Sequence, residues 1–425
     1  MSTNIIEKNG PVLGADGKPL KKSLQRTLRR QKFRAVILIV PLLLFILITF
    51  IIPIADMLFR SVENQIVSET LPRTVVALEG WDIDSGDTPE ENVFAALAED
   101  LKIAAAARQH MKLASRLNYE HSGISSLFRK SGRKAKKWDA AADAPFKEKF
   151  LKIDKNWGNP EVWRTIKTYS SPYTAGYFLN AVDLKLGADG VAMRDEDQRI
   201  YLLLLKRTLF MSLTITLGCI LLGYPVAWLL ANLPMRTSNI LLILVLLPFW
   251  TSLLVRTSAW KVLLQQQGVI NDALVWMRIV DDANRLALIN NQFGTIIAMT
   301  HILLPFMILP LYSVMKTIPP SYVRAAKSLG ATNWTAFWRV YFPQSIPGIG
   351  AGSILVFILS IGYYITPELV GGTDGVFISN RIAYHISTSL NWGLAAALGA
   401  ILLILVTALY WIYDRIVGID NVKLG

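Results

Sequence analysis

Residues 325–349 read AAKSLGATNWTAFWRVYFPQSIPGI, and this stretch lies between two long apolar runs of the chain. It is basic, with a glycine near its start and two prolines near its end. Pro319 and Pro320 precede it and can begin a helix, because the N–H groups that they lack would fall in a first turn without intrahelical partners. The pattern predicts a folded, basic segment between two membrane crossings.

We expect two short helices in this segment, separated by a glycine. The first, SYVRAAKSL, runs for about two turns and ends at Gly330, since glycine freely takes the left-handed conformation of a helix C′ position. The small side chains of Ala325 and Ala326 would let another protein approach this helix closely. An ordinary amphipathic hairpin at the membrane surface fits the same pattern.

The second helix, NWTAFWRVYF, is expected to begin with Asn333 as its N-cap. Pro343 and Pro347 would then bend the chain back into the next apolar run.

The composition favours a membrane protein. Of the 425 residues, 52% are hydrophobic and only 18% are charged, and the mean hydropathy is +0.38. A soluble domain carries about a quarter charged residues. The single cysteine, Cys219, cannot form an internal disulfide. The net charge of +13 therefore matters less than where the basic residues lie.

A spanning helix needs about 20 mostly apolar residues, because the hydrocarbon core of a bilayer is about 30 Å thick. Stretches of this kind predict six spans, of which the third is the shortest: 35–59, 208–233, 237–255, 293–315, 344–367 and 392–413. We therefore expect an all-α membrane protein.

Basic flanks predict the orientation of these spans. The segment KKSLQRTLRRQKFR before the first span is dense in positive charge and has no acid, which places the N-terminus in the cytoplasm. Six crossings return the C-terminus to the same side. The first span is longer than a signal-peptide core, so we expect it to be retained.

The domain organisation follows from these spans. We expect a basic cytoplasmic tail (1–34), a first span (35–59), a long and largely helical outside insertion (60–206), and a core of five spans (207–425) whose basic segment is 317–349. Within the insertion, RKSGRKAKKW (129–138) is either a solvated surface or a docking surface for an external partner protein. Nucleic acid is not expected on that side of the membrane.

Motifs for catalysis and metal binding were not found in the sequence. No G-x-x-x-x-G-K-[ST] phosphate-binding loop occurs, and no G-x-S-x-G nucleophile elbow. The four histidines (His110, His121, His301 and His385) lack metal-ligand spacing. We expect no catalytic residue, no metal site and no cofactor bound by this chain.

The 317–349 segment resembles the EAA loop of permease subunits in binding-protein-dependent ABC importers. Ala325, Ala326, Gly330 and Pro343 match the loop, whereas Arg324 stands at the glutamate position and Phe342 at the usual leucine. In that family the loop forms the coupling helix that sits in a groove of the ATPase subunit. The resemblance implies that coupling to the ATPase involves Arg324, Ala325, Ala326, Leu329, Gly330 and Ala331.

Four further blocks look like the spermidine/putrescine permease subfamily: GYPVAWLLANLP (223–234), LPFWTSLLVRTSAWKVLL (247–264), LPFMILPLYSVM (304–315) and GYYITPELVGG (362–372). The resemblance implies a non-catalytic, multi-pass subunit of the bacterial inner membrane, surrounded by lipid. Its implied partners are two ATPase subunits, which use the ATP and Mg²⁺, a second homologous permease chain, and a periplasmic substrate-binding protein. The 60–206 insertion looks longer than the loop typical of this subfamily.

A polyamine substrate needs carboxylates for its charge and aromatic faces for cation–π contact. Ionisable groups near membrane depth usually line an interior path. Glu368 follows Thr366–Pro367, where we expect the fifth span to break, and Arg256 is expected to pair with a carboxylate such as Glu368. The residues expected along the path are Trp250, Arg256, Trp260, Tyr363, Tyr364, Glu368 and Asp374.

Three alternatives remain open from the sequence. Glu368 and Asp374 could lie in solvent at the outer mouth. The substrate could carry an acidic group as well, as an amino-acid derivative, an opine or a phosphonate does. A stand-alone secondary transporter would need two similar halves, and the chain shows a single helix–glycine–helix loop.

Overall fold

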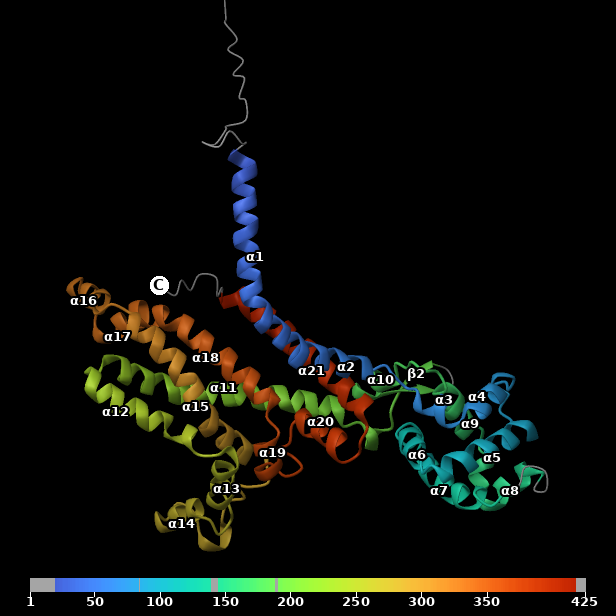
Figure 1. Ribbon diagram of the computed structural model, residues 1–425. Coiled ribbons are helices and arrows are strands. Elements are labelled where there is room, and N and C mark those ends of the chain that lie inside the picture. Colours follow the sequence, from blue (N-terminus) through green and yellow to red (C-terminus); the bar gives the residue numbers. More distant parts are fainter. Residues whose placement is uncertain (1–19, 84, 139–143, 188–189, 418–425) are drawn as a thin grey trace, which may run out of the picture. The chain divides into compact units, whose positions relative to one another are not determined.

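The computed structural model describes residues 20–83, 85–138, 144–187 and 190–417, and Figure 1 shows that nearly all of their regular structure is helical. The chain divides into two units, Met1–Phe59 and Arg60–Gly425. Among the described helices, five are long and apolar enough to cross a membrane, or six if one bent pair counts as a span. This agrees with the prediction of about six spans.

The first unit contains one apolar helical segment, Leu28–Arg60, which includes the predicted 35–59 span. It comprises α1 (Leu20–Ile46), a π-helical turn η1 (Leu47–Ile51) and α2 (Ile52–Arg60). The wide turn precedes Pro53, whose ring cannot be accommodated in a regular α-helical turn. The Ile52 N–H donates to the Leu47 carbonyl five residues earlier, so the helix continues past the proline.

The 60–206 insertion folds into short helices and one hairpin. Its elements are α3 (Ile66–Thr70), α4 (Pro72–Glu79), α5 (Glu91–Ala106), α6 (His110–Asn118), α7 (Ile124–Ala135), α8 (Phe146–Ile153), η2 (Lys155–Gly158), α9 (Pro160–Thr168), α10 (Gly176–Ala181), β1 (Leu184–Gly187), β2 (Gly190–Met193) and η3 (Glu196–Gln198). The antiparallel pair β1–β2, with Leu184 opposite Met193, departs from the all-α prediction.

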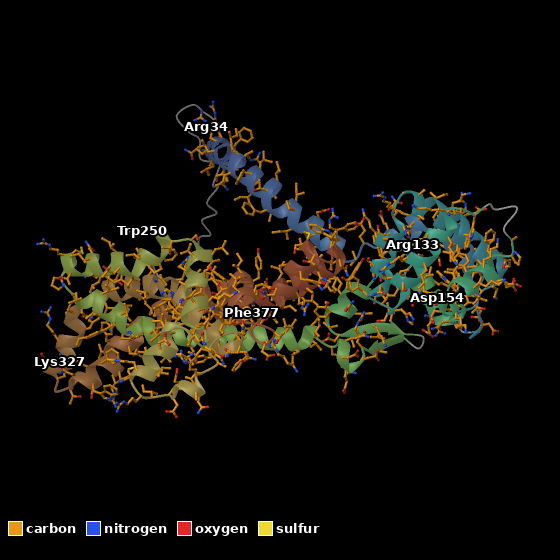
Figure 2. The ribbon with its side chains drawn as sticks, turned by 90° about the horizontal axis from the view of Figure 1, so that it is seen from below. Arg34, Arg133, Asp154, Trp250, Lys327 and Phe377 are labelled. Carbon is orange, nitrogen blue, oxygen red and sulfur yellow. The ribbon has the colours of Figure 1, made fainter. Side chains whose placement is uncertain are left out.

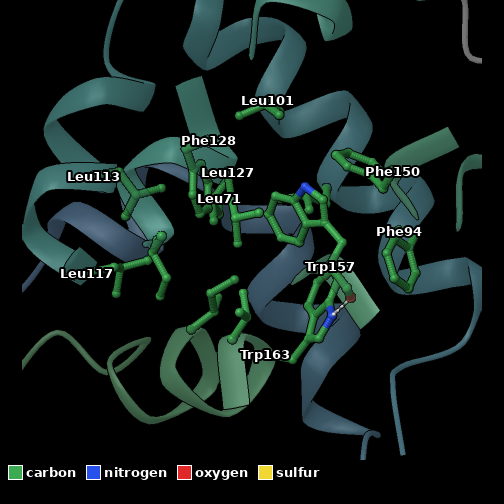
Figure 3. Close-up of a cluster of buried hydrophobic side chains, with 14 of the residues drawn as sticks. Leu71, Phe94, Leu101, Leu113, Leu117, Leu127, Phe128, Phe150, Trp157 and Trp163 are labelled. Carbon is green, nitrogen blue, oxygen red and sulfur yellow. Dashed lines mark hydrogen bonds between the residues drawn. The ribbon is translucent and has the colours of Figure 1, made fainter. Parts of the chain in front are cut away.

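The insertion has a hydrophobic core of its own, built around two tryptophans (Figure 3). Trp157 and Trp163 are fully buried, and their rings lie 5.4 Å apart. The Trp163 indole N–H donates to the Trp157 carbonyl (2.9 Å), and the Trp157 indole N–H donates to Ser131 Oγ (2.9 Å). Both polar indole atoms are therefore satisfied inside the core, as buried tryptophans usually require.

The basic run 129–138 covers the second half of α7, a helix with two distinct faces, and the turn after it. Leu127 and Phe128 are buried in the core of the insertion, whereas Arg133 is exposed (Figure 2). Lys130 pairs with Asp154 at 2.7 Å, and this ammonium group lowers the pKa of the Asp154 carboxyl. The charged side chains of the run thus lie on the exposed face of an amphipathic helix and on the turn that follows.

The second part of the larger unit is the core of candidate spans. Its elements are α11 (Tyr201–Asn232), α12 (Met235–Leu246), η4 (Leu247–Trp250), α13 (Leu253–Leu263), α14 (Val269–Trp276), η5 (Asp282–Asn284), α15 (Gln292–Thr317), α16 (Pro320–Ser328), α17 (Asn333–Ala336), η6 (Phe337–Tyr341), α18 (Phe342–Gly362), α19 (Ile365–Val370), α20 (Ile378–Ser387) and α21 (Trp392–Val417).

Helices α11, α15 and α18 pack against one another (Figure 1). Glycines permit this close approach: a Cβ on Gly223 would lie 3.1 Å from Met307 Cγ, and one on Gly352 would lie 2.6 Å from Met307 Sδ. Small residues at helix contacts are typical of membrane bundles, where packing rather than the hydrophobic effect drives association.

The third predicted span, 237–255, does not form one straight helix. Met235–Trp250 and Leu253–Leu263 form a pair bent by 93°. Thr251 between them is extended, and the Ser252 hydroxyl accepts a hydrogen bond from the Val255 N–H (3.2 Å), which begins a new helix in a new direction. The sequence pattern indicated the length of the apolar stretch, but it did not indicate that Ser252 is the N-cap of a second helix.

Asp183 joins the hairpin of the insertion to the start of α11. Its carboxylate is buried and accepts from the backbone N–H groups of Ile200, Tyr201 and Leu202, at 3.1, 3.0 and 2.8 Å. These donors have no partner within the helix, so the acid caps α11 and also favours its positive end. One residue thereby links the insertion to the first span of the core.

Candidate functional site

Helix α16 ends at Ser328, and Gly330 follows it as the left-handed C′ residue that the sequence predicts. Gly330 has a φ of +87°, its N–H donates to the Lys327 carbonyl (3.0 Å), and the Ala331 N–H donates to the Ala326 carbonyl (3.1 Å). This pair of bonds is a Schellman motif, which closes the last turn of a helix around a left-handed residue. A Cβ at Gly330 would meet no atom within 4 Å, so glycine is required here by the backbone alone.

The second half of the segment differs from its prediction in two ways. Thr332, rather than Asn333, is the N-cap of α17, because its hydroxyl accepts from the Thr335 N–H (3.2 Å). Pro343 does not bend the chain: Asn333–Gly362 is one continuous helical segment.

The reason is a π-helical turn, η6, placed directly before Pro343. Proline has no N–H and its ring clashes with the carbonyl four residues earlier in an α-helix. In η6 the Phe342 N–H donates to the Phe337 carbonyl five residues back, and the wider turn makes room for the ring. The side-chain amide of Gln344 also donates to the Val340 carbonyl at 2.7 Å.

The tip of the 317–349 segment is strongly exposed. The Leu329 side chain is 88% exposed and that of Trp334 is 71% exposed. Arg324 and Lys327 are also exposed, and neither makes an ion pair with the described part of the chain (Figure 2 labels Lys327). Two large apolar side chains next to unpaired cations are typical of a surface that another protein covers.

The fifth span breaks earlier than predicted. Helix α18 ends at Gly362, Tyr363 and Tyr364 form the break, and α19 begins at Ile365. Pro367 therefore lies in the first turn of α19, where its missing N–H removes no helical hydrogen bond. We placed the break at Thr366–Pro367, but the proline starts the second piece and does not end the first.

Asn380 on α20 holds the broken ends together. Its amide N–H₂ donates to the Tyr364 carbonyl (2.9 Å) and to Glu368 Oε2 (2.6 Å), while its Oδ1 accepts from the Phe377 N–H (2.9 Å). Sequence reasoning missed this residue. The signal was a short polar amide in an apolar stretch shortly after the break, where freed backbone groups need partners.

The bent third span packs against the broken fifth through α13 and α19, and the Thr257 and Thr366 hydroxyls are buried 3.0 Å apart. On the same helix α13, the Trp260 indole N–H donates to His301 Nδ1 (3.0 Å). The structure thus pairs Trp260, a predicted path residue, with His301, which the sequence did not place on the path.

The predicted pair between Arg256 and Glu368 is wrong. Within the described ranges neither side chain makes an ion pair, and the buried Arg256 Nε has no hydrogen-bond partner. Glu368 instead accepts from the neutral Asn380. Charge alone suggested the pair, but the direction of each helix after its break determines which groups meet.

Two predicted path residues lie apart from these groups. Trp250 ends η4 with 76% of its side chain exposed (Figure 2). Asp374 pairs with Arg207 at 3.6 Å, and its side chain is 72% exposed. Among the described residues, no group of three or more histidine, cysteine, aspartate or glutamate side chains is arranged to hold a metal.

The sequence of this chain is similar to a known protein family and to individual transport proteins. Residues 212–417 match the family described as "Binding-protein-dependent transport system inner membrane component". The chain is 35% identical over 226 residues to the spermidine/putrescine transport system permease protein PotB of Salmonella typhimurium, covering 53% of this chain and 78% of the relative. It is 33% identical to the inner membrane ABC transporter permease protein YdcU of Escherichia coli, covering 51% of this chain and 71% of the relative.

Among solved structures, the chain is similar to one chain of a bacterial ABC transporter involved in the import of the acidic polysaccharide alginate. The TM-score is 0.43 and the sequence identity is 20%, and the match covers 54% of this chain and 82% of that one. The sequence matches are the stronger finding, since they cover 78% and 71% of the two relatives and the family match spans the basic 317–349 segment. This chain therefore belongs to the family of binding-protein-dependent ABC importer permeases, as a non-catalytic, multi-pass subunit of the bacterial inner membrane.

Proposed function

We propose that this permease subunit moves a small cationic solute of the polyamine class into the cytoplasm, along a path beside α13 and α19. The observation that carries the proposal is Glu368. It is an exposed carboxylate at the break of a span, and within the described ranges no basic group lies within 4.0 Å of it. Similarity to a spermidine/putrescine permease supports the same substrate class.

The surroundings of Glu368 suit an ammonium group. Asn380 orients one carboxylate oxygen, which leaves the other able to accept from a substrate. The Tyr364 ring is 46% exposed at the same break. Charge-assisted hydrogen bonds are about twice as strong as neutral ones, and an aromatic face adds about 0.5–2 kcal/mol for a cation.

Arg256 supports a second candidate, a solute that carries an acidic group as well as an amine. Its Nε is buried and lacks a partner, and a buried charged group of this kind costs free energy unless something pairs with it. A carboxylate on the solute would pair with Arg256 while its amine reaches Glu368. Uptake of both solute classes by the same cells distinguishes the two candidates.

The 317–349 segment is proposed as the coupling surface toward an ATPase subunit. The exposed Leu329 would fill a pocket of that partner, with Arg324, Ala325, Ala326 and Ala331 around it. Because Arg324 replaces the glutamate of the family pattern, we infer an acidic group opposite it in the ATPase. A second permease chain and a periplasmic binding protein complete the proposed importer.

Replacing Glu368 by glutamine tests the path. The substitution keeps the hydrogen-bonding reach of the side chain but removes its charge, and a cationic solute would lose about 1–3 kcal/mol of stabilisation, a 5- to 150-fold effect on the step it limits. Uptake of labelled putrescine or spermidine should fall by that factor in cells whose only importer carries the variant, while basal ATPase activity remains.

Asp374→Asn is the matched control, since it removes the charge of an exposed acid in the same region. An exposed ion pair contributes about 0–1 kcal/mol, so uptake should stay near normal. Equal uptake by both variants and the parent would place Glu368 outside the path and remove the main support for a cationic substrate.

The exposed face of α7 and the turn after it are proposed to dock the binding protein. Arg133, Lys134, Lys136 and Lys137 are exposed there, and no ion pair involves them among the residues described. Steering between charged surfaces weakens as salt rises. Changing all four to glutamine should slow solute delivery by the binding protein several-fold at low ionic strength and have little effect at high ionic strength.

Lys152→Gln with Lys155→Gln serves as the comparison, because these lysines are exposed elsewhere on the same insertion. Initial uptake rates in proteoliposomes at two salt concentrations provide the measurement. If the fourfold variant matches the parent at every salt concentration, the face is solvated surface and the docking proposal fails.

A further inference from the structure

A cavity of about 650 Å³ lies where the insertion meets the connection between α20 and α21, apart from the proposed path. Tyr119 and Tyr177 of the insertion form one side, and Ser389–Gly393 form the other. Trp392 is the first residue of the candidate span Trp392–Arg415, so the cavity lies at the end of a span. This places it at the depth where lipid headgroups begin.

Three residues of the cavity wall each keep one polar atom without a hydrogen-bond partner in the described structure: Arg116 Nη2, Asn391 Nδ2 and Asn64 Oδ1. All three residues are more than nine-tenths buried. Buried polar atoms are nearly always paired, because an unpaired one costs about 1–3 kcal/mol. Three unpaired atoms in the wall of one cavity indicate a missing partner there.

The remaining atoms of these side chains are held firmly. Arg116 Nε donates to the Tyr177 hydroxyl (2.8 Å), and its guanidinium stacks 4.2 Å from the centre of that ring. Asn64 Nδ2 donates to the Tyr169 carbonyl (2.7 Å), which leaves its Oδ1 as an acceptor. Asn391 Oδ1 accepts from the Leu394 N–H (3.3 Å), which leaves its Nδ2 as a donor. The wall is thus preorganised as two donors and one acceptor.

The charges of the wall favour an anion. Two buried guanidinium groups, those of Arg116 and Arg194, share the carboxylate of Glu120, at 2.7 and 2.9 Å. Among the described residues, neither guanidinium makes an ion pair with a second carboxylate. The cavity lining contains the basic Arg60 and Lys112 besides Arg116, and Glu63 is its acid.

We propose that this cavity binds an anionic group with a hydrogen-bond donor beside it. The anion accepts from Arg116 Nη2 and Asn391 Nδ2, and the donor, an amine or hydroxyl, reaches Asn64 Oδ1. A free amino acid and the phosphate-and-amine headgroup of a phospholipid both have this chemistry. The inference concerns a site outside the path and does not rest on the proposed substrate.

The test uses the assembled importer with the full chain, in nanodiscs. One arm measures binding of labelled L-serine by equilibrium dialysis in phosphatidylcholine nanodiscs, with ethanolamine as a competitor that has the donor but no anion. The other arm counts retained lipids by native mass spectrometry in equal mixtures of phosphatidylethanolamine and phosphatidylcholine, which share the phosphate but differ in the donor.

The informative variant is Asn391→Asp, since aspartate caps α21 as well as asparagine but removes the donor and adds a negative charge. Lys155→Gln is its control, because it lowers the net charge by the same amount at an exposed position of the insertion. We expect the parent and Lys155→Gln to bind alike, and Asn391→Asp to bind at least about tenfold more weakly.

Saturable binding of L-serine would identify a soluble ligand, and selective retention of phosphatidylethanolamine would identify a lipid headgroup. Either result supports the site if Asn391→Asp weakens it. Binding of neither probe by the parent, equal binding by Asn391→Asp, or full displacement of L-serine by ethanolamine would overturn the proposal.

Discussion

Gly330→Val should reduce both solute uptake and solute-stimulated ATP hydrolysis. Valine at a φ of +87° places a β-branched side chain in a conformation that costs about 1–3 kcal/mol. The backbone would relieve this strain by opening the two bonds of the Schellman motif, from Gly330 to Lys327 and from Ala331 to Ala326. Those bonds fix the exposed Leu329 and Ala331 relative to α16, so the proposed coupling surface would lose its shape.

The measurement is solute-stimulated ATP hydrolysis by the importer in proteoliposomes, together with uptake. A strain of this size corresponds to a factor of about 5 to 150 in an equilibrium constant. We expect stimulated hydrolysis and uptake each to decrease by a factor in this range. Insertion into the membrane should be normal, because a Cβ at this position contacts nothing within 4 Å.

Gly330→Asn tests whether backbone strain, or the presence of any side chain at this position, causes the loss of activity. Asparagine enters the left-handed region more readily than other residues with a Cβ, so this variant should retain most of the stimulation. If valine leaves stimulated hydrolysis and uptake unchanged, the segment does not transmit the motion of the ATPase. If Gly330→Asn lowers stimulated hydrolysis and uptake as much as Gly330→Val does, the added side chain rather than backbone strain disturbs the contact with the partner.

Asp183→Ala should have the largest effect on stability. It leaves the first three N–H groups of α11 without their shared acceptor and removes a negative charge from the positive end of that helix. Asp183 also has a φ of +59°, which alanine adopts with strain. Losing a buried cap of this kind costs about 2–5 kcal/mol.

Thermal unfolding of the detergent-purified chain, followed by size-exclusion chromatography, should show a midpoint lower by about 5 °C or more. Limited proteolysis should cleave faster between residues 184 and 199, because the cap holds this connection against α11. Asp183→Asn keeps the Oδ1 acceptor and tolerates the positive φ, so its loss should be intermediate. An alanine variant as stable as the parent would mean that water satisfies these donors.

Several features could be predicted from short stretches of the sequence alone. The apolar runs near 208–233, 293–315 and 392–413 form α11, α15 and α21, because a bilayer requires that length of apolar helix whatever the neighbours are. The positive φ of Gly330 follows from the same kind of reasoning, since only its own backbone demands it. The family pattern around Ala325, Ala326 and Gly330 likewise indicated an ABC importer permease before any fold was known.

Tertiary structure decided the features that depend on groups far apart in the chain. The 93° bend before α13 and the break at Tyr363–Tyr364 set the positions of Arg256 and Glu368, and in the described structure Glu368 accepts from Asn380 and not from Arg256. The role of Asn380 depends on the packing of α20 against α19, and the cavity beside Arg116 depends on the packing of the insertion against the start of α21. Helix propensity and hydropathy are local quantities, whereas a hydrogen bond from Asn380 to Glu368 or an unpaired Nη2 on Arg116 depends on where distant segments meet.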